Sequence, residues 1–448
     1  MREVVFLHIG QAGAEIGAAC WDLFCEEHGV GVQGVKTPGQ DQAGCESIFT
    51  ESSRGVHTPR AVFVDLEPSV LHKIQGRSEI FSPDRFVNGK EDSASNYWRG
   101  FYQVQSIRDT VEDAIRHSVE ECDALQGFVA TYSIGGGTGS AATSHIMADL
   151  EKSYTKVSNI GFNLLPSPTL STSVVEPYNA VFATSDLLDC MSGVFIVDNQ
   201  SLYRVCSDSL GIECPTYSDI NNVVAITVSA ITASLRYNSG LNTHLRDIET
   251  NLVPFPRIHF LIPSHTTAAH HTVADLTSMV YLPANQLCKA NHRQGLYMAS
   301  CLLYRGDVVP RDINSAIMKI KTDKSIRFVD WCPTGFKIGI NPEPCLTMPG
   351  VQQARTLCKI DNTTATRQVW DNIHKKVRET IIYITIMYFI IFHQFDLLHS
   401  KRAFVHWFVG LGIEDSVFAY ARYNTAALEE DYKEIEENNS GTFTQDEY

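Results

Sequence analysis

The sequence lacks the features that mark several common classes of protein. It has 36 lysines and arginines against 51 aspartates and glutamates, so its formal net charge is −15. Because contact with nucleic-acid phosphates needs clustered basic residues, we do not expect a nucleic-acid partner. The 12 cysteines are scattered as singles without a C-x-x-C pair. A zinc site is therefore not expected, and we interpret the cysteines as reduced thiols.

Signals for export and membrane insertion are also missing. The N-terminal residues show no charged lead followed by a long apolar stretch and a small-residue cleavage site, so we expect a cytoplasmic protein. One apolar run, residues 381–392, has Thr385 as its one plainly polar residue. It is shorter than the roughly 20 residues that a membrane span requires. We therefore expect no membrane partner, and a buried strand or core helix is the simplest interpretation of this run.

Composition and patterning predict an α/β fold. With 448 residues, 44% of them hydrophobic, the chain can bury a large core. Its first half alternates short β-branched runs with helical patterns, which is typical of a parallel sheet covered by helices on both faces. Strands are predicted at residues 4–9, 61–64 and 127–132. Helices are predicted after the turn at residues 10–13 to about residue 25, and from about residue 141. Residues 31–59, rich in Gly, Gln, Ser and Thr, are predicted as a long surface loop.

Two glycine-rich turns follow predicted strands and precede predicted helices. They are residues 133–140, SIGGGTGS, and residues 10–13, GQAG. Such turns let a phosphate chain approach free backbone N–H groups and the positive end of a helix. Neither is a Walker A loop, and a purely structural turn is the alternative for a glycine run alone. Because both turns can meet at the carboxyl edge of one sheet, we predict a ligand site there.

Two carboxylates mark the end of another predicted strand. Asp65 and Glu67 lie two positions apart after the strand at 61–64, so they share a face. Carboxylates on one face suit a hydrated magnesium ion beside phosphates. A solvated strand terminus is the alternative for each acid alone.

The glycine run nearly matches the tubulin signature, and other blocks resemble alpha-tubulins over nearly the whole chain. These blocks are residues 60–68, 174–179, 250–254, 302–310, 328–337 and 401–407. The resemblance implies a tubulin-type parallel nucleotide-binding sheet flanked by helices, an α+β intermediate domain and C-terminal helices. It divides the chain into a GTP-binding domain (1–198), an intermediate domain (199–363), a C-terminal helical region (364–435) and a disordered acidic tail (436–448).

The resemblance also implies GTP and Mg²⁺ as cofactors and assigns residues to them. Glu67 would hold magnesium through water, Asp92 would lie near the phosphates, and Tyr217 would stack on the base. The residues assigned to the phosphates are Gln11, Ala12, Ser133, Gly136, Gly137, Thr138 and Gly139. Those assigned to the ribose are Thr172 and Glu176, and those assigned to the guanine edge are Asn199 and Asn221.

Several positions depart from the family pattern. Ser95 stands where the family has an asparagine near the terminal phosphate, and Ala141 replaces the last glycine of the signature. In alpha-tubulins a glutamate before block 250–254 orients the water that attacks the GTP of the next beta subunit. Asp247 occupies that position here, and His244 stands where the family has aspartate. Asp247 is therefore the implied catalytic residue, with a surface acid on a helix as the alternative.

The leading functional hypothesis is an alpha-type subunit of microtubules that pairs with beta-tubulin and forms part of the microtubule lattice. It would bind one non-exchangeable GTP and supply a carboxylate for hydrolysis of the GTP of its beta partner. The second is a subunit that forms the heterodimer but polymerises poorly, acting as a regulatory or specialised axonemal tubulin. Two features favour the second: the segment between Phe260 and Pro283 is shorter than in typical alpha-tubulins, and Val417 and Tyr420 replace acids that motors use. A free-standing GTPase is the third and least favoured hypothesis.

The C-terminal end resembles the substrate of tubulin-modifying enzymes. Tyr448 is the terminus on which tyrosine removal acts in the family, and Lys36 is a candidate for acetylation, with a solvated lysine as the alternative. Candidate acids for polyglutamylation are Glu434, Glu436 and Glu437.

Residues 377–394 interrupt the resemblance. Without them, Lys376 would join Phe395 and restore the continuous helix of the family. The segment begins with valine, whose codons start with GT, and ends with glutamine, which can be encoded by CAG. These match the ends of ordinary introns, so we predict the translation of an unspliced intron. A genuine apolar insertion, such as a partner-binding helix, is the alternative.

Overall fold

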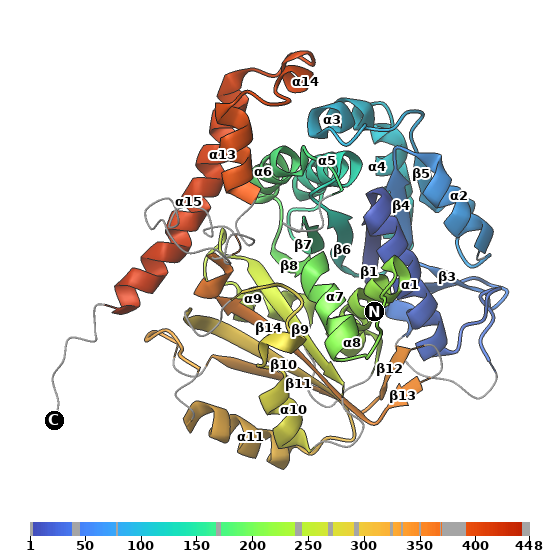
Figure 1. The fold of residues 1–448 in the computed structure, drawn as a ribbon. Helices are drawn as coiled ribbons and strands as arrows, with labels where there is room; N and C mark the ends of the chain where they lie inside the picture. Colours follow the sequence, from blue (N-terminus) through green and yellow to red (C-terminus); the bar gives the residue numbers. More distant parts are fainter. Residues whose placement is uncertain are drawn as a thin grey trace.

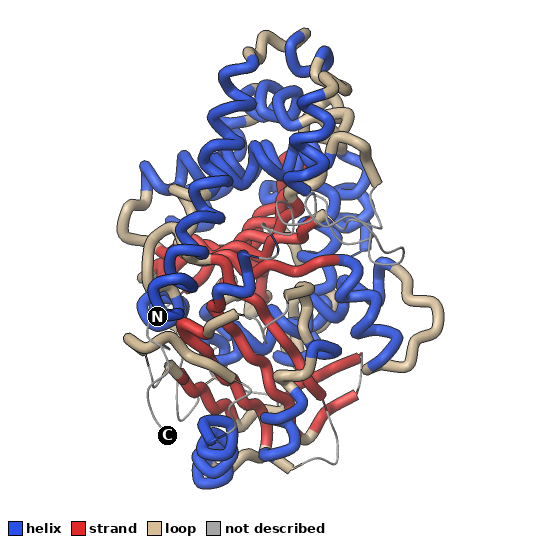
Figure 2. The backbone as a smooth tube through the Cα atoms, turned by 60° about the vertical axis from the view of Figure 1, so that its left-hand side comes forward, coloured by secondary structure: helices blue, strands red, loops and turns tan. Residues whose placement is uncertain are grey.

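A ten-stranded sheet runs through the middle of the molecule, with helices on both sides (Figures 1 and 2). The computed structural model describes residues 3–37, 45–77, 79–166, 172–237, 244–267, 272–290, 295–322, 326–332, 335–348, 351–367, 369 and 391–440. The strand order is β11-β10-β14-β9-β8-β7-β6-β1-β4-β5. Neighbours from β9 to β5 are parallel, whereas β14 runs antiparallel to both β9 and β10. This arrangement confirms the predicted α/β fold class.

The strands of this sheet are β1 (Glu3–Ile9), β4 (Ala61–Asp65), β5 (Phe86–Asn88), β6 (Leu125–Ser133), β7 (Ser158–Leu165), β8 (Gly193–Asp198), β9 (Phe260–Thr267), β10 (Tyr297–Gly306), β11 (Phe336–Asn341) and β14 (Arg355–Thr363). A separate hairpin pairs β12 (Cys345–Met348) with β13 (Val351–Gln353).

The α-helices up to α11 are α1 (Gly10–His28), α2 (Pro68–Arg77), α3 (Tyr97–Gln105), α4 (Arg108–Glu120), α5 (Gly137–Ser153), α6 (Glu176–Leu187), α7 (Asn199–Asp208), α8 (Tyr217–Arg236), α9 (Leu245–Leu252), α10 (Val273–Met279) and α11 (Pro310–Thr322). Short 3₁₀ helices are η1 (Cys45–Ser47), η2 (Pro83–Arg85), η3 (Pro283–Asn285) and η4 (Thr364–Thr366). Helix α5 begins earlier than predicted, because the glycines at 137 and 139 form its first turn instead of a loop before it.

The alternation of β1 divides the core between the two faces of the sheet. Val5 and Leu7 pack on the face covered by α3, α5 and α6, whereas Val4 and Phe6 pack on the face covered by α1 and α8. Both sets are fully buried, as expected for a parallel strand with helices on each side. Figure 1 shows α3, α4, α5 and α6 together, with α13 and α15 beside α6.

The predicted loop at residues 31–59 is wrong in its second half. There η1 leads into a hairpin of β2 (Phe49–Glu51) and β3 (His57–Pro59). Ile48 and Phe49 are buried, and the Phe49 ring packs edge-on against Trp21 of α1 with ring centroids 5.4 Å apart. Tertiary packing therefore orders a segment whose polar composition predicted a loop.

Three helices close the described chain: α13 (Ile391–Ser400), α14 (His406–Val409) and α15 (Asp415–Ser440). Helix α15 includes five residues, 436–440, that the sequence assigned to the tail. The Glu436 carboxylate accepts a hydrogen bond from the Arg367 guanidinium at 2.9 Å, and Lys433 Nζ lies 3.8 Å from the Glu437 carboxylate. These contacts explain the longer helix. Most of the suspected insertion, residues 377–390, and the terminus at 441–448 with Tyr448 lie outside the described residues.

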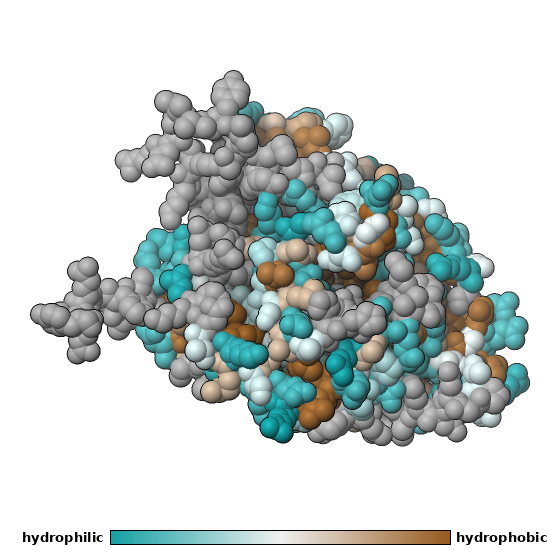
Figure 3. Space-filling model, turned by 60° about the horizontal axis from the view of Figure 1, so that its bottom comes forward, coloured by the Kyte–Doolittle hydropathy of each residue, from teal (hydrophilic) through white to brown (hydrophobic). Residues whose placement is uncertain are grey.

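The surface of the described chain mixes polar and apolar residues. Seen from the end that carries α10 and α11, apolar residues form separate patches among polar ones (Figure 3). No helix among the described residues combines the length and the apolarity that crossing a membrane would need.

A buried ion pair joins two residues of β14. The Lys359 ammonium contacts the Asp361 carboxylate, and both side chains are fully buried. Lys359 Nζ lies 4.2 Å from the centroid of the Tyr281 ring, and the Ser300 hydroxyl donates to Asp361 at 2.7 Å. Burial lowers the pKa of Lys359 and raises the pKa of Asp361. Each charge is therefore tolerated because the other is present.

We expect Asp361→Asn to lower the free energy of unfolding by about 3–5 kcal/mol, because it leaves a buried ammonium without its counter-charge. The double variant Lys359→Met/Asp361→Asn should recover most of that loss, since no buried charge remains. Urea unfolding followed by tryptophan fluorescence measures both. Equal losses in the single and double variants would contradict this account.

Candidate functional site

A cavity of about 430 Å³ lies at the carboxyl ends of β1, β4, β6 and β7. Its lining brings together every residue that the resemblance assigned to GTP: Gln11, Ala12, Glu67, Asp92, Ser133, Gly136, Gly137, Thr138, Gly139, Thr172, Glu176, Asn199, Tyr217 and Asn221. These residues come from loops and helix ends that are far apart in sequence. The edge of a parallel sheet is where open α/β folds bind their ligands.

The two glycine turns touch each other on one side of this cavity. Gly10 has a φ of +73°, and a Cβ added there would lie 2.7 Å from the Cα of Gly139. A Cβ on Gly13 would lie 2.2 Å from the carbonyl oxygen of Thr131. A larger residue at position 10 would push the turns apart, and one at position 13 would push α1 away from β6. The glycines thus allow α1 and α5 to begin side by side at the cavity.

Neither helix that begins at the turns has a side-chain cap. The residues before α1 and α5 are Ile9 and Gly136, and neither accepts a hydrogen bond through a side chain. The first N–H groups of both helices therefore remain available at the positive ends of the helix dipoles. Two such ends lining one cavity suit an anionic ligand with several oxygens, such as a phosphate chain.

The opposite side of the cavity is shaped by partly buried hydrogen bonds. Glu176, at the start of α6, accepts from the N–H and hydroxyl of Thr172 at 2.9 and 2.8 Å. Tyr217 is 60% exposed at the first position of α8, so one face of its ring is free to stack. Asn199 opens α7, and Asn221 lies one turn along α8. This side offers an aromatic surface and two amides.

Asn179 is a supporting residue that the sequence reasoning did not single out. It is fully buried and its amide donates to the carbonyls of Ser95 and Gly135 at 2.8 and 2.9 Å, while its oxygen accepts from the N–H of Tyr97 at 3.0 Å. It therefore ties the loop of Ser95 to the glycine run. The one sequence signal for this role of Asn179 is its position at the end of residues 174–179, a block that resembles alpha-tubulins.

The two departures at the cavity have different structural settings. Ser95 lines the cavity with a φ of +56°, a left-handed conformation that asparagine adopts more readily than serine. Ala141 is fully buried inside α5, where a Cβ on Gly100 would lie 3.2 Å from its methyl group. Ala141 thus packs against α3 and does not line the cavity.

Three acids border the cavity near the end of β4. Asp65 is 3% exposed, and its Oδ2 atom has no hydrogen-bond partner among the described residues. Burial, with the nearby Glu67 and Asp92 charges, raises the pKa of Asp65 to about 7. Within the described residues no group of three His, Cys, Asp or Glu side chains could hold a metal alone. A cation here would thus need water or ligand oxygens as well, which suits magnesium.

Asp247 does not line the cavity among the described residues. It lies in the first turn of α9, where its Oδ2 accepts from the backbone N–H of His244 at 3.2 Å and lies 3.5 Å from Lys337 Nζ. Its side chain is 32% exposed. The carboxylate is therefore partly exposed at the surface and lies outside this chain's own cavity.

A parallel sheet with two uncapped helix ends, an aromatic surface and paired amides around one cavity defines a nucleotide-binding α/β protein. Comparison with known families agrees: residues 3–207 match the GTPase domain of the Tubulin/FtsZ family, and residues 256–375 match the tubulin C-terminal domain. Together the two matches cover most of the chain, which belongs to the tubulin family. It therefore carries the GTPase domain of a cytoskeletal family.

Proposed function

We propose that this chain is an alpha-type tubulin that pairs with beta-tubulin, retains one GTP with Mg²⁺, and enters the microtubule lattice. The observation that supports this most strongly is the single cavity lined by every residue assigned to GTP from the family pattern. In this proposal the glycine turns form the phosphate side of the cavity, and Tyr217 with Asn199 and Asn221 forms the base side.

In this proposal the first turns of α1 and α5 hold the phosphates through Gln11, Ala12 and the glycines of the signature. Their N–H groups and helix dipoles stabilise the phosphate charge. Glu67 and its neighbour Asp65 would hold Mg²⁺ through water, and the ion would neutralise part of that charge. Asn199 and Asn221 would read the guanine edge while Tyr217 stacks on the ring.

Hydrolysis is proposed to occur in trans, at the GTP of the next beta subunit. The exposed position of Asp247 on α9, outside the chain's own cavity, supports this role. The carboxylate would orient the attacking water. Because aspartate is one methylene shorter than glutamate, we expect slow hydrolysis.

The second candidate is a subunit that forms the heterodimer but polymerises poorly. Tyr420 and Tyr423 are 64% and 71% exposed on α15, so the outer surface there is aromatic where motors would meet acids. Residues 268–271, in the shortened lateral segment, lie outside the described residues. Co-expression with beta-tubulin followed by pelleting with GTP separates the candidates: polymer in the pellet supports the first, and soluble heterodimer supports the second.

The proposal predicts about one tightly held GTP per chain. Denaturing the purified protein and separating nucleotides by chromatography should release GTP, and prior incubation with EDTA should reduce the amount, because Mg²⁺ contributes to retention. Folded protein without nucleotide would contradict the proposal.

Gly10→Ala should remove most of the bound nucleotide. Its φ is positive and the new methyl group would meet Gly139, so the two turns must separate. Gly76→Ala is the matched control, because Gly76 lies in α2 with open space around it, and alanine there should be neutral or stabilising by up to about 1 kcal/mol. Bound GTP per chain is the measurement. Equal GTP content in both variants would show that the contact between the turns is not needed.

A further inference from the structure

Asp247 has one ion-pair partner among the described residues, and that partner comes from a different part of the fold. Lys337 is the second residue of β11, and its Nζ lies 3.5 Å from Oδ2 of Asp247. Strand β11 is the last strand of the sheet, where Lys337 lies opposite Cys301 of β10 in the parallel register. The side chains of Asp247 and Lys337 are 32% and 29% exposed. The pair therefore lies at the surface, where α9 meets the edge of the sheet.

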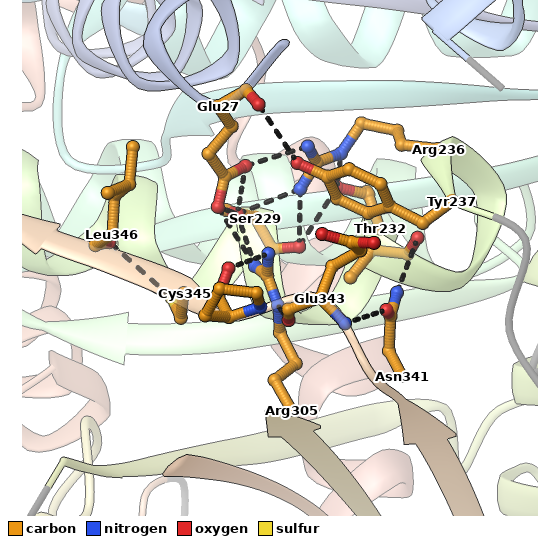
Figure 4. Close-up of polar contacts among 12 residues, drawn as sticks. Glu27, Ser229, Thr232, Arg236, Tyr237, Arg305, Asn341, Glu343, Cys345 and Leu346 are labelled. Carbon is orange, nitrogen blue, oxygen red and sulfur yellow. Dashed lines mark hydrogen bonds and ion pairs between the residues drawn. The ribbon is translucent and has the colours of Figure 1, made fainter. Parts of the chain in front are cut away.

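The strand that carries this lysine is anchored at its other end by buried groups (Figure 4). The amide of Asn341, the last residue of β11, donates to the carbonyl of Ala233 at 3.1 Å. Just beyond the strand, Arg305 of β10 donates to the carbonyl of Pro344 at 3.0 Å and pairs with Glu27 at 3.0 Å. Both side chains of that ion pair are 1% exposed. An anchored strand holds its side chains in place more precisely than a loop does.

Oδ2 of Asp247 receives two contacts from two different elements. The backbone N–H of His244 donates to it at 3.2 Å from the start of α9, and the Lys337 ammonium approaches it from β11. The terminal torsion of an aspartate side chain is broad, so one hydrogen bond from its own helix leaves the plane of the carboxylate free to turn. The second contact restricts that rotation. It also opposes the charge, because a carboxylate without a cation beside it would repel the phosphates of a neighbouring nucleotide.

We propose that Lys337 is a positioning residue for the hydrolysis of the next subunit's GTP. It holds Oδ2 of Asp247, so that the carboxylate keeps the orientation in which it directs the attacking water, and it compensates the negative charge that would face the phosphates. In the reaction the water oxygen bonds to the terminal phosphorus and GDP leaves, while Lys337 exchanges no proton and forms no bond. This inference rests on the proposed role of Asp247 in trans and adds a second side chain to it.

Lys337→Met removes the ammonium and keeps an unbranched apolar stem. We expect it to slow phosphate release from preformed polymer by about 10-fold, less than the roughly 100-fold that a displacement of 1 Å costs in a positioned reaction, because the His244 contact remains. Lys337→Arg keeps a cation within reach of Asp247 and should release phosphate at nearly the unsubstituted rate. Release is measured in a single turnover per pelleted chain, after co-expression with beta-tubulin and assembly with GTP. Lys337→Gln, which also lacks the cation, gives a second measurement of the same loss should methionine hinder folding.

Lys321→Met is the matched control. Lys321 lies in α11, and its Nζ is 5.6 Å from the centroid of the Phe336 ring. Because adjacent residues of a strand point to opposite faces, this substitution removes an ammonium beside β11 on the face away from Lys337. It should leave phosphate release unchanged. Pelleting with a GTP analogue that is not hydrolysed should be equal for all variants, which separates hydrolysis from assembly.

A double-mutant cycle tests whether Lys337 acts through the carboxylate. In the Asp247→Asn protein no carboxylate remains to be positioned, so the addition of Lys337→Met should slow release by less than about twofold. The amide oxygen of asparagine still accepts a hydrogen bond from water, so release there remains measurable. A general effect of Lys337 on the polymer would instead slow release by the same factor in both backgrounds.

Unchanged release in Lys337→Met, equal factors in both backgrounds, or failure of Lys337→Arg to match the unsubstituted protein would overturn the inference. Each of these results leaves the proposed function intact, provided that Asp247→Asn slows release. If Asp247→Asn releases phosphate as fast as the unsubstituted protein, or if the unsubstituted protein forms no polymer with beta-tubulin, the proposed function and the inference are overturned together.

Discussion

Asp247→Glu should raise polymer-coupled phosphate release by up to about 100-fold, because a displacement of about 1 Å in a positioned reaction costs about that factor. In the proposed alpha-type role, the additional methylene would restore the reach of the carboxylate across the interface with the next beta subunit. Glutamate in the first turn of a helix can still accept from the backbone before it. The substitution should therefore leave α9 stable.

The measurement is phosphate release from preformed polymer in a single turnover, with pelleted protein quantified in parallel so that a change in assembly is not mistaken for a change in hydrolysis. Asp247→Asn is the control, since it keeps the size of the side chain and removes the carboxylate. It should release phosphate more slowly than the unsubstituted protein. No change or a fall in Asp247→Glu would show that Asp247 does not orient the water.

The position of Asp247 also shows what keeps its carboxylate in place before assembly. Lys337 of β11 lies 3.5 Å away, and the His244 N–H donates to the same oxygen. Both contacts lie on one side of the carboxylate. The other oxygen is not engaged by either of these groups.

The parts of the site that could be predicted from the sequence are those encoded locally. Glycine turns after strands and the acids at the end of β4 follow from short-range patterns, and the cavity brings these residues together. The start of α5 could not be predicted from the sequence. The glycines at 137 and 139 are compatible with a loop and with a first helical turn, and only contacts with the rest of the fold decide between the two.

Other features depend on contacts between residues far apart in sequence. The left-handed backbone of Ser95 is supported by Asn179, which is separated from it by 84 residues. The hairpin of β2 and β3 depends on packing against α1, and Arg305 meets Glu27 across 278 residues. Polar residues such as these look like surface residues in the sequence, because their burial requires partners that only the fold supplies.

The residues on either side of the segment 377–394 can be compared with the tubulin family and with the packing of the fold. The match to the tubulin C-terminal domain ends at residue 375, two positions before Val377. On the other side, Phe395 is buried, with its ring centroid 5.2 Å from that of Tyr178, and Asp396 pairs with Arg422 at 2.9 Å. Phe395 and Asp396 therefore pack within α13 (Ile391–Ser400), a helix whose first four residues belong to the suspected insertion.

We propose that residues 377–394 are translated intron sequence, and we expect a chain without them to be more soluble by a large factor. Deletion joins Lys376 directly to Phe395 and removes the apolar run at 381–392, which would otherwise favour aggregation when exposed. Soluble yield on co-expression with beta-tubulin is the measurement.

Deletion of an equal length from the tail, residues 431–448, is not a suitable control, because Tyr432 is fully buried. A suitable control replaces residues 377–394 by a polar linker of the same length. This linker keeps the interruption and removes only the apolar character of the segment. If heterodimer formation needs Lys376 joined directly to Phe395, the linker variant should improve solubility without restoring heterodimer formation, whereas the deletion should restore both.

Sequencing mature transcripts tests the origin of the segment. Messages that uniformly retain the segment would refute the intron proposal. A deletion that folds but no longer pairs with beta-tubulin would instead identify the segment as a genuine partner-binding insertion.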